Sequence, residues 1–387
     1  MCRQWLPGIL LFLMVSCNMQ EPGQDAPLAT FTATQEYSEG SKTQMDGLSI
    51  VWSAGDDISV FSASVAGGER YSISPDGAGQ QKAVFTGTQV GSAPYYALYP
   101  WDSAASLADG SVNFRLPQVQ PYSENGFAQG ANPMVSVTSG DDFVFRNLCG
   151  LLRITLTGSA VIKSVSITSA AQEALWGDAG VNMSFADAPV LEIKSAPDEQ
   201  HRTLTLDCGD GVPLTAEGVS FTFVIPDGAL SGGFTFKAVD SVSGAMEKST
   251  ATDLSIVRSK LKKMGTIPYH RTSSPFLDLD EYGVYDLTGS EPLAIRTYQK
   301  GTDQLALNRA FTGNSFRIQS LHDGNAIVVG TTEQMQVGHE YTLSLTSYGQ
   351  TGVEDAQVQA VLLKSSGGKL WLEDEASGRG YIIAGEL

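Results

Sequence analysis

Histidine, the residue most often used as a catalytic base or metal ligand, is rare in this sequence. The histidines are His201, His270, His322 and His339. The segment HEYTL at 339–343 begins like the zinc-protease motif H-E-x-x-H but lacks the second histidine. It also lies in an alternating pattern typical of a strand, whereas the motif needs both histidines on one helical face. We therefore interpret it as a chance match.

Paired acidic residues suggest a second kind of chemistry, calcium binding. DLDEYG at 278–283 brings carboxylates together, but position twelve of such a loop is Gly289, where a bidentate glutamate is required. We interpret this segment as a solvated linker or strand edge, and LEDEASG at 372–378 as an exposed turn. The sequence contains neither G-x-S-x-G nor a C-x-x-C pair. We predict no enzyme, no cofactor and no metal site, while a glycosidase carboxylate pair, which needs no proximity in sequence, stays open.

Two cysteines lie well beyond the N-terminal segment, Cys149 and Cys208. In HRTLTLDCG, Leu204, Leu206 and Cys208 share one strand face, which indicates that Cys208 is a small core residue. Cys149 lies where the alternation changes phase, and we expect a bend at Gly150. An exported protein permits a Cys149–Cys208 disulfide, but no spacing rule requires one, so their pairing stays open.

The N-terminus has the pattern of a secretion signal. Arg3 precedes a short apolar run at residues 6–15, and Ser16 precedes Cys17. The run is too short to span a bilayer, which needs about 20 residues. LMVSC resembles a bacterial lipobox, in which the cysteine is lipidated; the alternative is an ordinary signal peptide with this cysteine by chance. We expect residues 1–17 to be a lipoprotein signal peptide and Cys17 to carry palmitate, so that the lipid alone anchors the chain.

The chain is strongly acidic, with a formal net charge of −18 at pH 7. Such a surface repels phosphate backbones and anionic lipids, which argues against nucleic-acid binding. The acidic residues are spread along the chain, as on a solubilising surface. Hydrophobic residues make up 42% of the sequence, enough for the cores of two or three domains of about 100–200 residues each.

Short alternating segments closed by turn signals dominate the chain, without interleaved helices. Examples are YYALYPW at 95–101, VSFTFVIPDG at 219–228 and the apparent hairpin AVLLKSSGGKLWLED at 360–374. This spacing predicts an all-β chain of tandem β-sandwich domains.

The turn-rich segments suggest where the domains begin and end. We predict an N-terminal β-sandwich domain at 18–142 and a second β-sandwich domain at 143–270. RTSSP at 271–275 is a plausible linker. We predict an additional C-terminal β-rich domain at 276–387.

Six segments follow the N-terminal signal in a recognisable order. They are WSAGDDISVF at 52–61, YYALYPW at 95–101, the glutamine- and proline-rich loop at 118–136, FRNLCGLLRITLTG at 145–158, FVIPDGALSGGFTFKAVDS at 223–241 and IVRSKLKKMGTI at 256–267. Their order resembles that in fimbrillin-like lipoproteins, the subunits and accessory proteins of type V pili in Bacteroidota. The resemblance covers about residues 1–270. It implies two transthyretin-like, Greek-key sandwich domains and a lipid-anchored, surface-exposed position at the cell outer membrane.

The resemblance also implies a function in fimbriae and adhesion. We expect a structural or adhesive component that acts by strand-edge assembly and by contact with protein or glycan. Its partners would be other fimbrial subunits or a host or bacterial surface ligand, and it would touch the membrane only through its lipid. The alternative is a glycan-binding surface lipoprotein of a nutrient-uptake system.

Two departures from the family pattern favour a tip, anchor or accessory subunit. In this family, assembly involves a cut after an arginine near the start of the first domain, which removes a strand and opens a groove for a donor strand. Here the first arginine after Cys17 is Arg70, and Lys42 is the earlier basic residue. A cut at Arg70 would remove two expected strands, IVW and ISVF. The second departure is the additional domain at 276–387.

Aromatic residues of two landmarks have two interpretations. Trp52 is expected to cap a sandwich core beside a turn at Asp56. Tyr95, Tyr99 and Trp101 either belong to the same framework or line a platform for a glycan or a partner. We keep these three residues as candidate binding residues.

The last segment, YIIAGEL at 381–387, contains an unusual apolar triplet. Either it completes the sheet of the C-terminal domain by pairing with the hairpin at 360–374, or it is a donor strand for a neighbouring subunit. We favour pairing within the domain, because the turn residues before it allow an antiparallel return.

Overall fold

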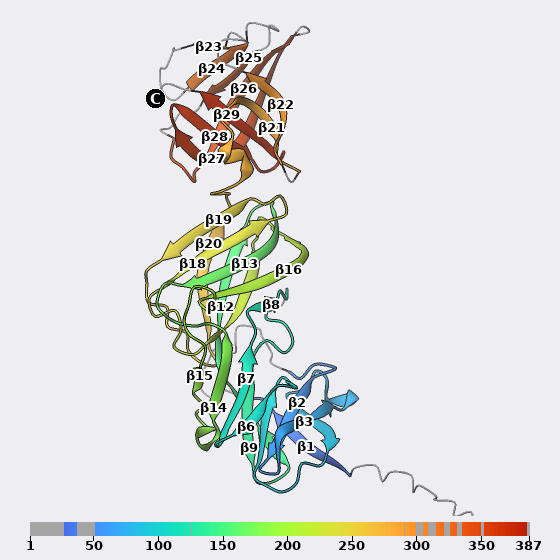
Figure 1. Cartoon of the computed structure of the whole chain (residues 1–387). Helices are drawn as coiled ribbons and strands as arrows, with labels where there is room; N and C mark the ends of the chain where they lie inside the picture. Colours follow the sequence, from blue (N-terminus) through green and yellow to red (C-terminus); the bar gives the residue numbers. More distant parts are fainter. Residues whose placement is uncertain are drawn as a thin grey trace, which may run out of the picture.

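The structure is a computed structural model that describes residues 27–36, 51–124, 126–289, 291–298, 305–308, 315–320, 326–330, 335–349 and 352–384. These residues form β-strands and the short 3-10 helices η1 (Pro75–Gly77), η2 (Met183–Phe185) and η3 (Pro275–Asp278), which confirms the predicted all-β, sandwich-type fold. Figure 1 shows the strands in three groups stacked along one axis. No helix in the described part of the chain is long and apolar enough to cross a membrane.

The N-terminal group is a sheet of eight strands in the order β10-β1-β4-β3-β2-β5-β9-β11. Its strands are β1 (Leu28–Thr34), β2 (Asp57–Ser62), β3 (Val65–Ile73), β4 (Lys82–Thr88), β5 (Tyr95–Tyr99), β9 (Met134–Thr138), β10 (Asp142–Val144) and β11 (Arg146–Asn147). Aromatic side chains fill its core, and the ring of Trp52 makes edge contacts with Phe85, Tyr99 and Phe145. Such contacts orient the rings and add to the free energy gained by burying them.

The expected core and turn in WSAGDDISVF are confirmed. Trp52 is buried, and the turn that follows is closed by a hydrogen bond from the Ser53 backbone N–H to Asp56 Oδ2 (2.6 Å). Gly55 adopts a φ of +82°, which favours glycine. Trp52 itself lies outside a strand, so the expected strand IVW is not formed at this residue.

The middle group contains a five-stranded sheet, β19-β18-β13-β16-β8, and a three-stranded sheet, β17-β12-β20, which share one core. Their strands are β8 (Val119–Pro121), β12 (Cys149–Thr157), β13 (Val161–Ser169), β16 (Thr203–Pro213), β17 (Val219–Pro226), β18 (Phe234–Asp240), β19 (Ala245–Thr250) and β20 (Leu261–Pro268). Leu204, Leu206 and Cys208 point into this core, as predicted. Cys149 and Cys208 are both buried and free, so the disulfide is not formed.

The expected bend at Gly150 is absent, because β12 continues through this residue. The alternation is lost there because four successive residues of β12, from Cys149 to Leu152, are buried. A Cβ atom at Gly150 would lie 2.3 Å from the carbonyl oxygen of Val257, so glycine permits the close approach of that loop. The register of β12 against β20 shifts further along, between Arg153 and Thr155.

A four-stranded sheet, β15-β14-β7-β6, joins segments from both sides of residue 142. Its strands are β6 (Ser106–Ala108), β7 (Ser111–Leu116), β14 (Gly177–Asn182) and β15 (Leu191–Ile193). β8 also pairs with β16, and the buried Gln120 side chain on β8 binds both the N–H and the C=O of Val224 (3.0 and 2.8 Å). The expected division after residue 142 thus falls inside β10, and shared sheets connect the two parts.

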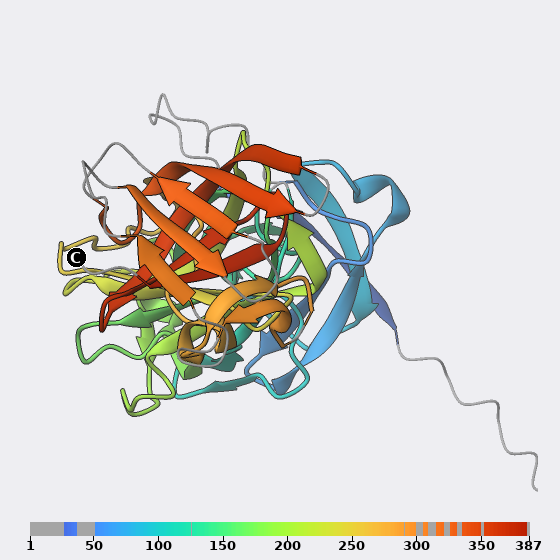
Figure 2. The ribbon, with the colours of Figure 1, turned by 90° about the horizontal axis from the view of Figure 1, so that it is seen from above.

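The C-terminal group is a sheet in the order β22-β21-β29-β28-β27-β26-β25-β24-β23. Its strands are β21 (Tyr282–Asp286), β22 (Leu293–Tyr298), β23 (Leu305–Asn308), β24 (Ser315–Ser320), β25 (Ala326–Gly330), β26 (Glu340–Gly349), β27 (Gly352–Ser366), β28 (Lys369–Asp374) and β29 (Arg379–Ala384). β27 and β28 form the predicted hairpin with its turn at Gly367 and Gly368. HEYTL lies on the strand β26 from its second residue, Glu340, onward, as its alternation indicated. Figure 2 shows this sheet from above, at the end opposite the N-terminal strands.

The segment YIIA belongs to β29, which lies between β28 and β21 and is antiparallel to both. This confirms that it completes the sheet of its own domain. Tyr381 and Ile383 face one apolar cluster, and Ile382 faces another that η3 covers with Phe276 and Leu277. Burial on both faces explains why three apolar residues follow one another here.

We predict that Ile382→Ala destabilises the C-terminal sheet by about 2–5 kcal/mol, because it leaves a cavity beneath η3. Ile295→Ala, on the edge strand β22, should change stability by less than about 0.5 kcal/mol, since that side chain is 53% exposed. Hydrogen–deuterium exchange of peptides from β28 and β29 measures the difference. Equal protection in the two variants would contradict the internal position of β29.

Candidate functional site

The first strand, β1, is held on both edges inside the N-terminal sheet. It is antiparallel to β4, from Leu28 opposite Thr88 to Thr34 opposite Lys82. It is parallel to β10 at residues 32–34. Removing β1 would leave the backbone groups of β4 and β10 unpaired on either side of an empty slot. Such a slot, which we call the β1 slot, fits another extended chain.

The inner side of the β1 slot restricts the size of the side chains that an occupant can place in the core. Phe31 is buried, and its ring contacts those of Tyr71, Tyr95 and Phe143 at centroid distances of 5.4, 5.0 and 4.9 Å. Ala33 is fully buried, and its carbonyl oxygen accepts a hydrogen bond from Trp52 Nε1 (3.0 Å). An occupant of the slot therefore needs a large ring and, two residues later, a small side chain.

The carboxylate of Glu36 occupies one end of the slot. Its Oε2 accepts hydrogen bonds from the Asn147 backbone N–H (3.1 Å), Ser259 Oγ (2.9 Å) and Arg258 Nη1 (2.7 Å). Its Oε1 lies 4.0 Å from Arg146 Nη1. The Glu36 side chain is only 13% exposed, so the contacts connect the end of β1 both to β11 and to the loop before β20.

The three candidate binding residues do not share one exposed surface. Tyr99 is buried, and its hydroxyl donates to Asp56 Oδ1 (2.8 Å); burial and this carboxylate raise the pKa of the phenol well above its usual range. Tyr95 packs against Phe31 of β1. Trp101 is 37% exposed. Tyr95 and Tyr99 thus form part of the framework around β1, and binding through Trp101 stays a prediction.

The predicted processing and lipidation residues have different positions. Cys17 and Lys42 lie outside the described residues. Arg70 lies on β3 with its side chain 54% exposed, forms an ion pair with Asp57 (2.5 Å) and covers the Trp101 ring. A cut at Arg70 would separate β1, β2 and most of β3 from the rest of the sheet.

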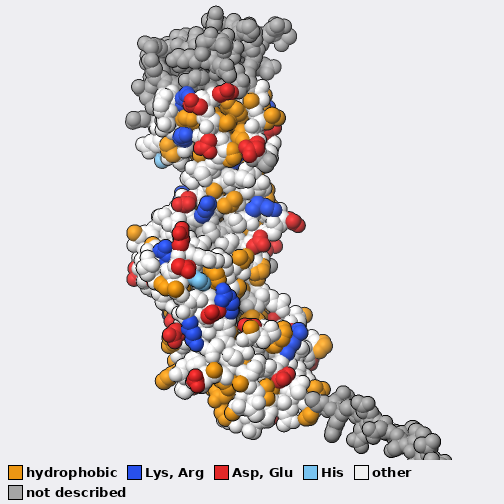
Figure 3. All heavy atoms as spheres, viewed as in Figure 1, with side chains coloured by type: hydrophobic (Ala, Val, Ile, Leu, Met, Phe, Trp, Pro, Cys, Tyr) orange, Lys and Arg blue, Asp and Glu red, His pale blue; other side chains and the backbone are white. Residues whose placement is uncertain are grey.

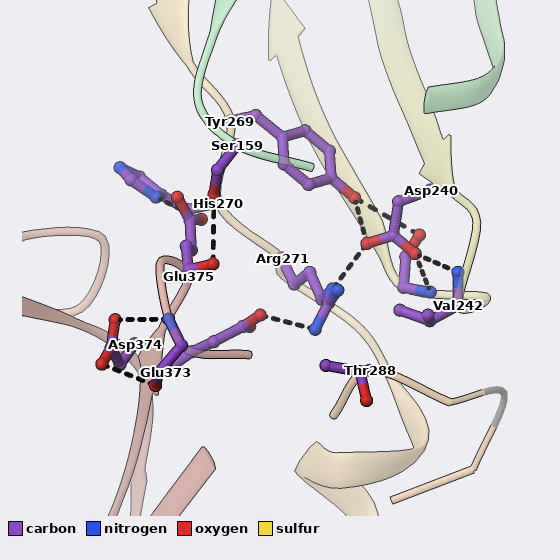
Figure 4. A network of polar contacts seen from close by, with 12 residues as sticks. Ser159, Asp240, Val242, Tyr269, His270, Arg271, Thr288, Glu373, Asp374 and Glu375 are labelled. Atoms are coloured by element: carbon purple, nitrogen blue, oxygen red, sulfur yellow. Dashed lines mark hydrogen bonds and ion pairs between the residues drawn. The ribbon is translucent and has the colours of Figure 1, made fainter. Parts of the chain in front are cut away.

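A second polar cluster joins the middle and C-terminal groups, as Figure 4 shows. Arg271 donates from Nε to Asp240 Oδ2 at the end of β18 and from Nη1 to Glu373 Oε1 on β28, both at 2.5 Å. Tyr269 donates its hydroxyl hydrogen to the same Asp240 oxygen (3.0 Å). The expected linker at 271–275 is therefore packed, and Ser273 also forms an isolated β-bridge with Ala245.

One guanidinium thus faces two buried carboxylates, and a second ion pair lies beside it. Burial raises the pKa of Glu373 to about 7, and this effect exceeds the opposing effect of Arg271. The Oε2 atom of Glu373 is buried without a hydrogen-bond partner. His270 Nδ1 lies 3.0 Å from Glu375 Oε1. The network is therefore sensitive to protonation near neutral pH.

A cavity of about 540 Å³ lies at this junction. It is lined by Ser243, Thr272, Ser273, Ser274, Pro275, Leu277, Asp278, Leu363 and Lys364. Hydroxyl groups predominate, and none of the lining side chains is aromatic, so the cavity offers no ring for stacking on a sugar.

Acidic side chains of both DLDEYG and LEDEASG form ion pairs in the described structure. Asp280 of DLDEYG forms an ion pair with Lys369. The residues that the structure describes contain no group of three or more His, Cys, Asp or Glu residues placed to hold a metal ion. Figure 3 shows acidic and basic side chains interspersed on the visible face.

Sequence reasoning missed Glu36, Arg258, Arg271 and Glu373. Glu36 and Arg258 are 222 positions apart, and Arg271 and Glu373 are 102 positions apart. Neither pair falls in a motif with fixed spacing, so the sequence contains no local signal that connects them.

We predict that the junction becomes less stable as pH rises. In the unfolded chain Glu373 loses its proton near its ordinary pKa of 4.5, whereas the folded chain keeps it up to about pH 7. The free energy of unfolding should therefore fall across this window, by on the order of 3 kcal/mol. Glu373→Gln should remove most of this loss, as measured by thermal unfolding at about pH 5 and pH 8. Glu217→Gln, at an exposed glutamate outside this network, is the control; an unchanged pH dependence in Glu373→Gln would contradict the prediction.

Comparison with known proteins adds no family to this description. No model of a known protein family matches the chain, and no curated protein matches it either.

Proposed function

We propose that this chain is a fimbrillin-like lipoprotein of the cell surface, a structural or adhesive subunit that assembles by exchanging its β1 strand. The observation that carries the proposal is the position of β1, an early strand held between β4 and β10 with apolar side chains directed inward. The order of landmarks that resembles fimbrillin-like lipoproteins supports it. The mechanism is strand addition, in which backbone hydrogen bonds give affinity and alternate side chains give specificity.

Exchange of β1 requires a break in the chain between β1 and β2. A break within residues 37–50 would end the covalent connection between β1 and β2, with all the other described strands of the sheet on the second fragment. Lys42 lies in this segment and fits a trypsin-like protease, whereas a cut at Arg70 would also cut off β2 and most of β3. We therefore propose that maturation cuts the chain at Lys42.

The C-terminal domain favours a terminal or accessory position in the fimbria over a position in its stalk. A stalk subunit must both accept a strand and donate one. β29 is not free for donation, because it pairs on both sides and both of its faces are buried. A subunit with a β1 slot and an internal β29 can accept a strand from a partner, but it cannot donate β29 to another subunit.

We predict that a labelled peptide of residues 27–36 replaces β1 in a chain cut between β1 and β2. A recognition sequence for a site-specific protease is inserted within residues 37–50 of the full chain, and the purified protein is cut and incubated with peptide. The wild-type peptide should remain bound through gel filtration. A Phe31→Asp peptide should not, because it buries an unpaired charge at a cost of several kcal/mol.

Two results would contradict this proposal. The first is a cut chain that never takes up the wild-type peptide although its own β1 dissociates. The second is equal uptake of the wild-type and Phe31→Asp peptides, which would mean that binding does not use the slot.

We predict that Cys17→Ala releases the protein from the membrane fraction. The lipid on Cys17 is the proposed anchor, and one acyl chain alone binds membranes only marginally, so the modification must supply several chains. Metabolic labelling with palmitate and membrane fractionation measure the effect, with Cys208→Ala as the control. Labelling of the Cys17→Ala protein would place the lipid elsewhere.

A further inference from the structure

We infer that the β1 slot accepts strands that present a carboxylate just beyond the strand, and that Arg146, Asn147, Arg258 and Ser259 form the receptor for it. This inference rests on the proposed exchange of β1 and adds the chemical class of the incoming strand. In the intact chain Glu36, two residues after the end of β1, occupies the receptor.

The receptor supplies a complete set of donors for one carboxylate. A backbone N–H, a hydroxyl group and a guanidinium converge on Glu36 Oε2, and a second guanidinium faces Oε1. Charge-assisted hydrogen bonds of this kind are roughly twice as strong as those between neutral groups. Asn147 Nδ2 lies 3.5 Å from the same oxygen and also donates to Ser259 Oγ (3.1 Å).

The donors are also held by contacts with elements other than β1. Asn147 lies on β11, which pairs with β9. Ser259 is fixed by a hydrogen bond from its backbone N–H to the Cys149 carbonyl oxygen (3.0 Å), and its φ of +58° is unusual for a residue other than glycine. Arg258 Nη1 also donates to the Asn147 carbonyl oxygen (3.1 Å). These contacts hold the donors from outside β1, while the neighbouring Phe145 N–H also donates to the Thr34 carbonyl oxygen of β1 (2.8 Å).

An empty receptor would hold two partly buried arginines without their carboxylate. The Arg146 and Arg258 side chains are 29% and 24% exposed. Arg146 Nε is buried and donates to no acceptor in the described structure. Asp227, the other carboxylate at this loop, accepts a hydrogen bond from the Arg258 backbone N–H (2.6 Å). An incoming strand that lacks an acidic residue would leave a desolvated positive charge, which is costly.

The slot and the receptor together specify a partner sequence. The incoming strand should carry an aromatic residue, a small residue two positions later and an acidic residue three positions after that. In this chain Phe31, Ala33 and Glu36 have that spacing. The aromatic and small residues fill the core, and the carboxylate fixes the register. A shift of one residue would turn the aromatic and small side chains to the outer face and would displace the carboxylate from the receptor.

The test compares two C-terminally amidated peptides of residues 27–36 in the cut full chain, one with Glu36 and one with Glu36→Gln; the amide removes the terminal carboxylate that would otherwise place a second negative charge at residue 36. We expect both to enter the slot, the second at least about tenfold more weakly, because it leaves the receptor without a countercharge. Arg258→Gln in the protein should reduce this difference to about twofold or less, since it removes the guanidinium that hydrogen-bonds Glu36 (2.7 Å) and leaves Arg146 at 4.0 Å. Arg115→Gln is the matched control, because Arg115 forms an exposed ion pair with Asp178 on β14.

The outcomes separate this inference from the proposed function. If neither peptide enters, exchange of β1 is wrong and the receptor has no incoming strand to recognise. If both enter with equal affinity, exchange stands and selection for a carboxylate is overturned. If Arg258→Gln and Arg115→Gln reduce the preference equally, the effect comes from the net charge of the protein and the receptor is likewise overturned.

Discussion

Backbone pairing of β1 on both of its edges is the interaction on which the N-terminal part of the molecule depends. β1 lies between β4, which follows it after about fifty residues of chain, and β10, which follows much later. Its side chains Phe31 and Ala33 complete a core of aromatic rings, and Trp52 donates to its backbone. A buried sheet cannot leave these backbone groups unpaired, so the domain needs a strand in this position but not a covalently continuous one.

Local alternation in the sequence predicted the strands well where one face is buried. Leu204, Leu206 and Cys208 were predicted correctly, because the period of two residues reports the burial of one face directly. The hairpin at 360–374 was also predicted correctly, from its glycine turn, although both of its faces are buried. The absence of a bend at Gly150 was not predicted, because β12 is buried on both faces at its start and a phase change there does not mark a turn. The sheets that cross residue 142 were also missed, since pairing such as β7 with β14 depends on tertiary contacts that no local pattern reports.

The candidate site was less predictable than the fold, for a physical reason. Tyr95 and Tyr99 attracted attention as aromatic residues; Tyr95 packs against Phe31 of β1, and Tyr99 is buried against Asp56 with little surface for a ligand. The side chains with unusual environments are instead single charged residues, Glu36 and Arg271, each buried between segments that are far apart in the chain. A charge is buried only with partners in place, and those partners become neighbours only after folding.

The two clusters of charged side chains, around Glu36 and around Arg271, differ in whether a partner can be replaced by another molecule. At the end of β1, four donors surround the Glu36 carboxylate, so a replacement strand must carry the same charge in addition to the aromatic and small residues that fill the core. At the other cluster the partners reverse: one guanidinium, Arg271, serves two carboxylates, Asp240 and Glu373, and all three belong to packed segments of the sheets or of the chain between them. Removing a partner there leaves a buried charge with no replacement available from outside. The first cluster therefore suits exchange between molecules, while the second suits a fixed connection within one.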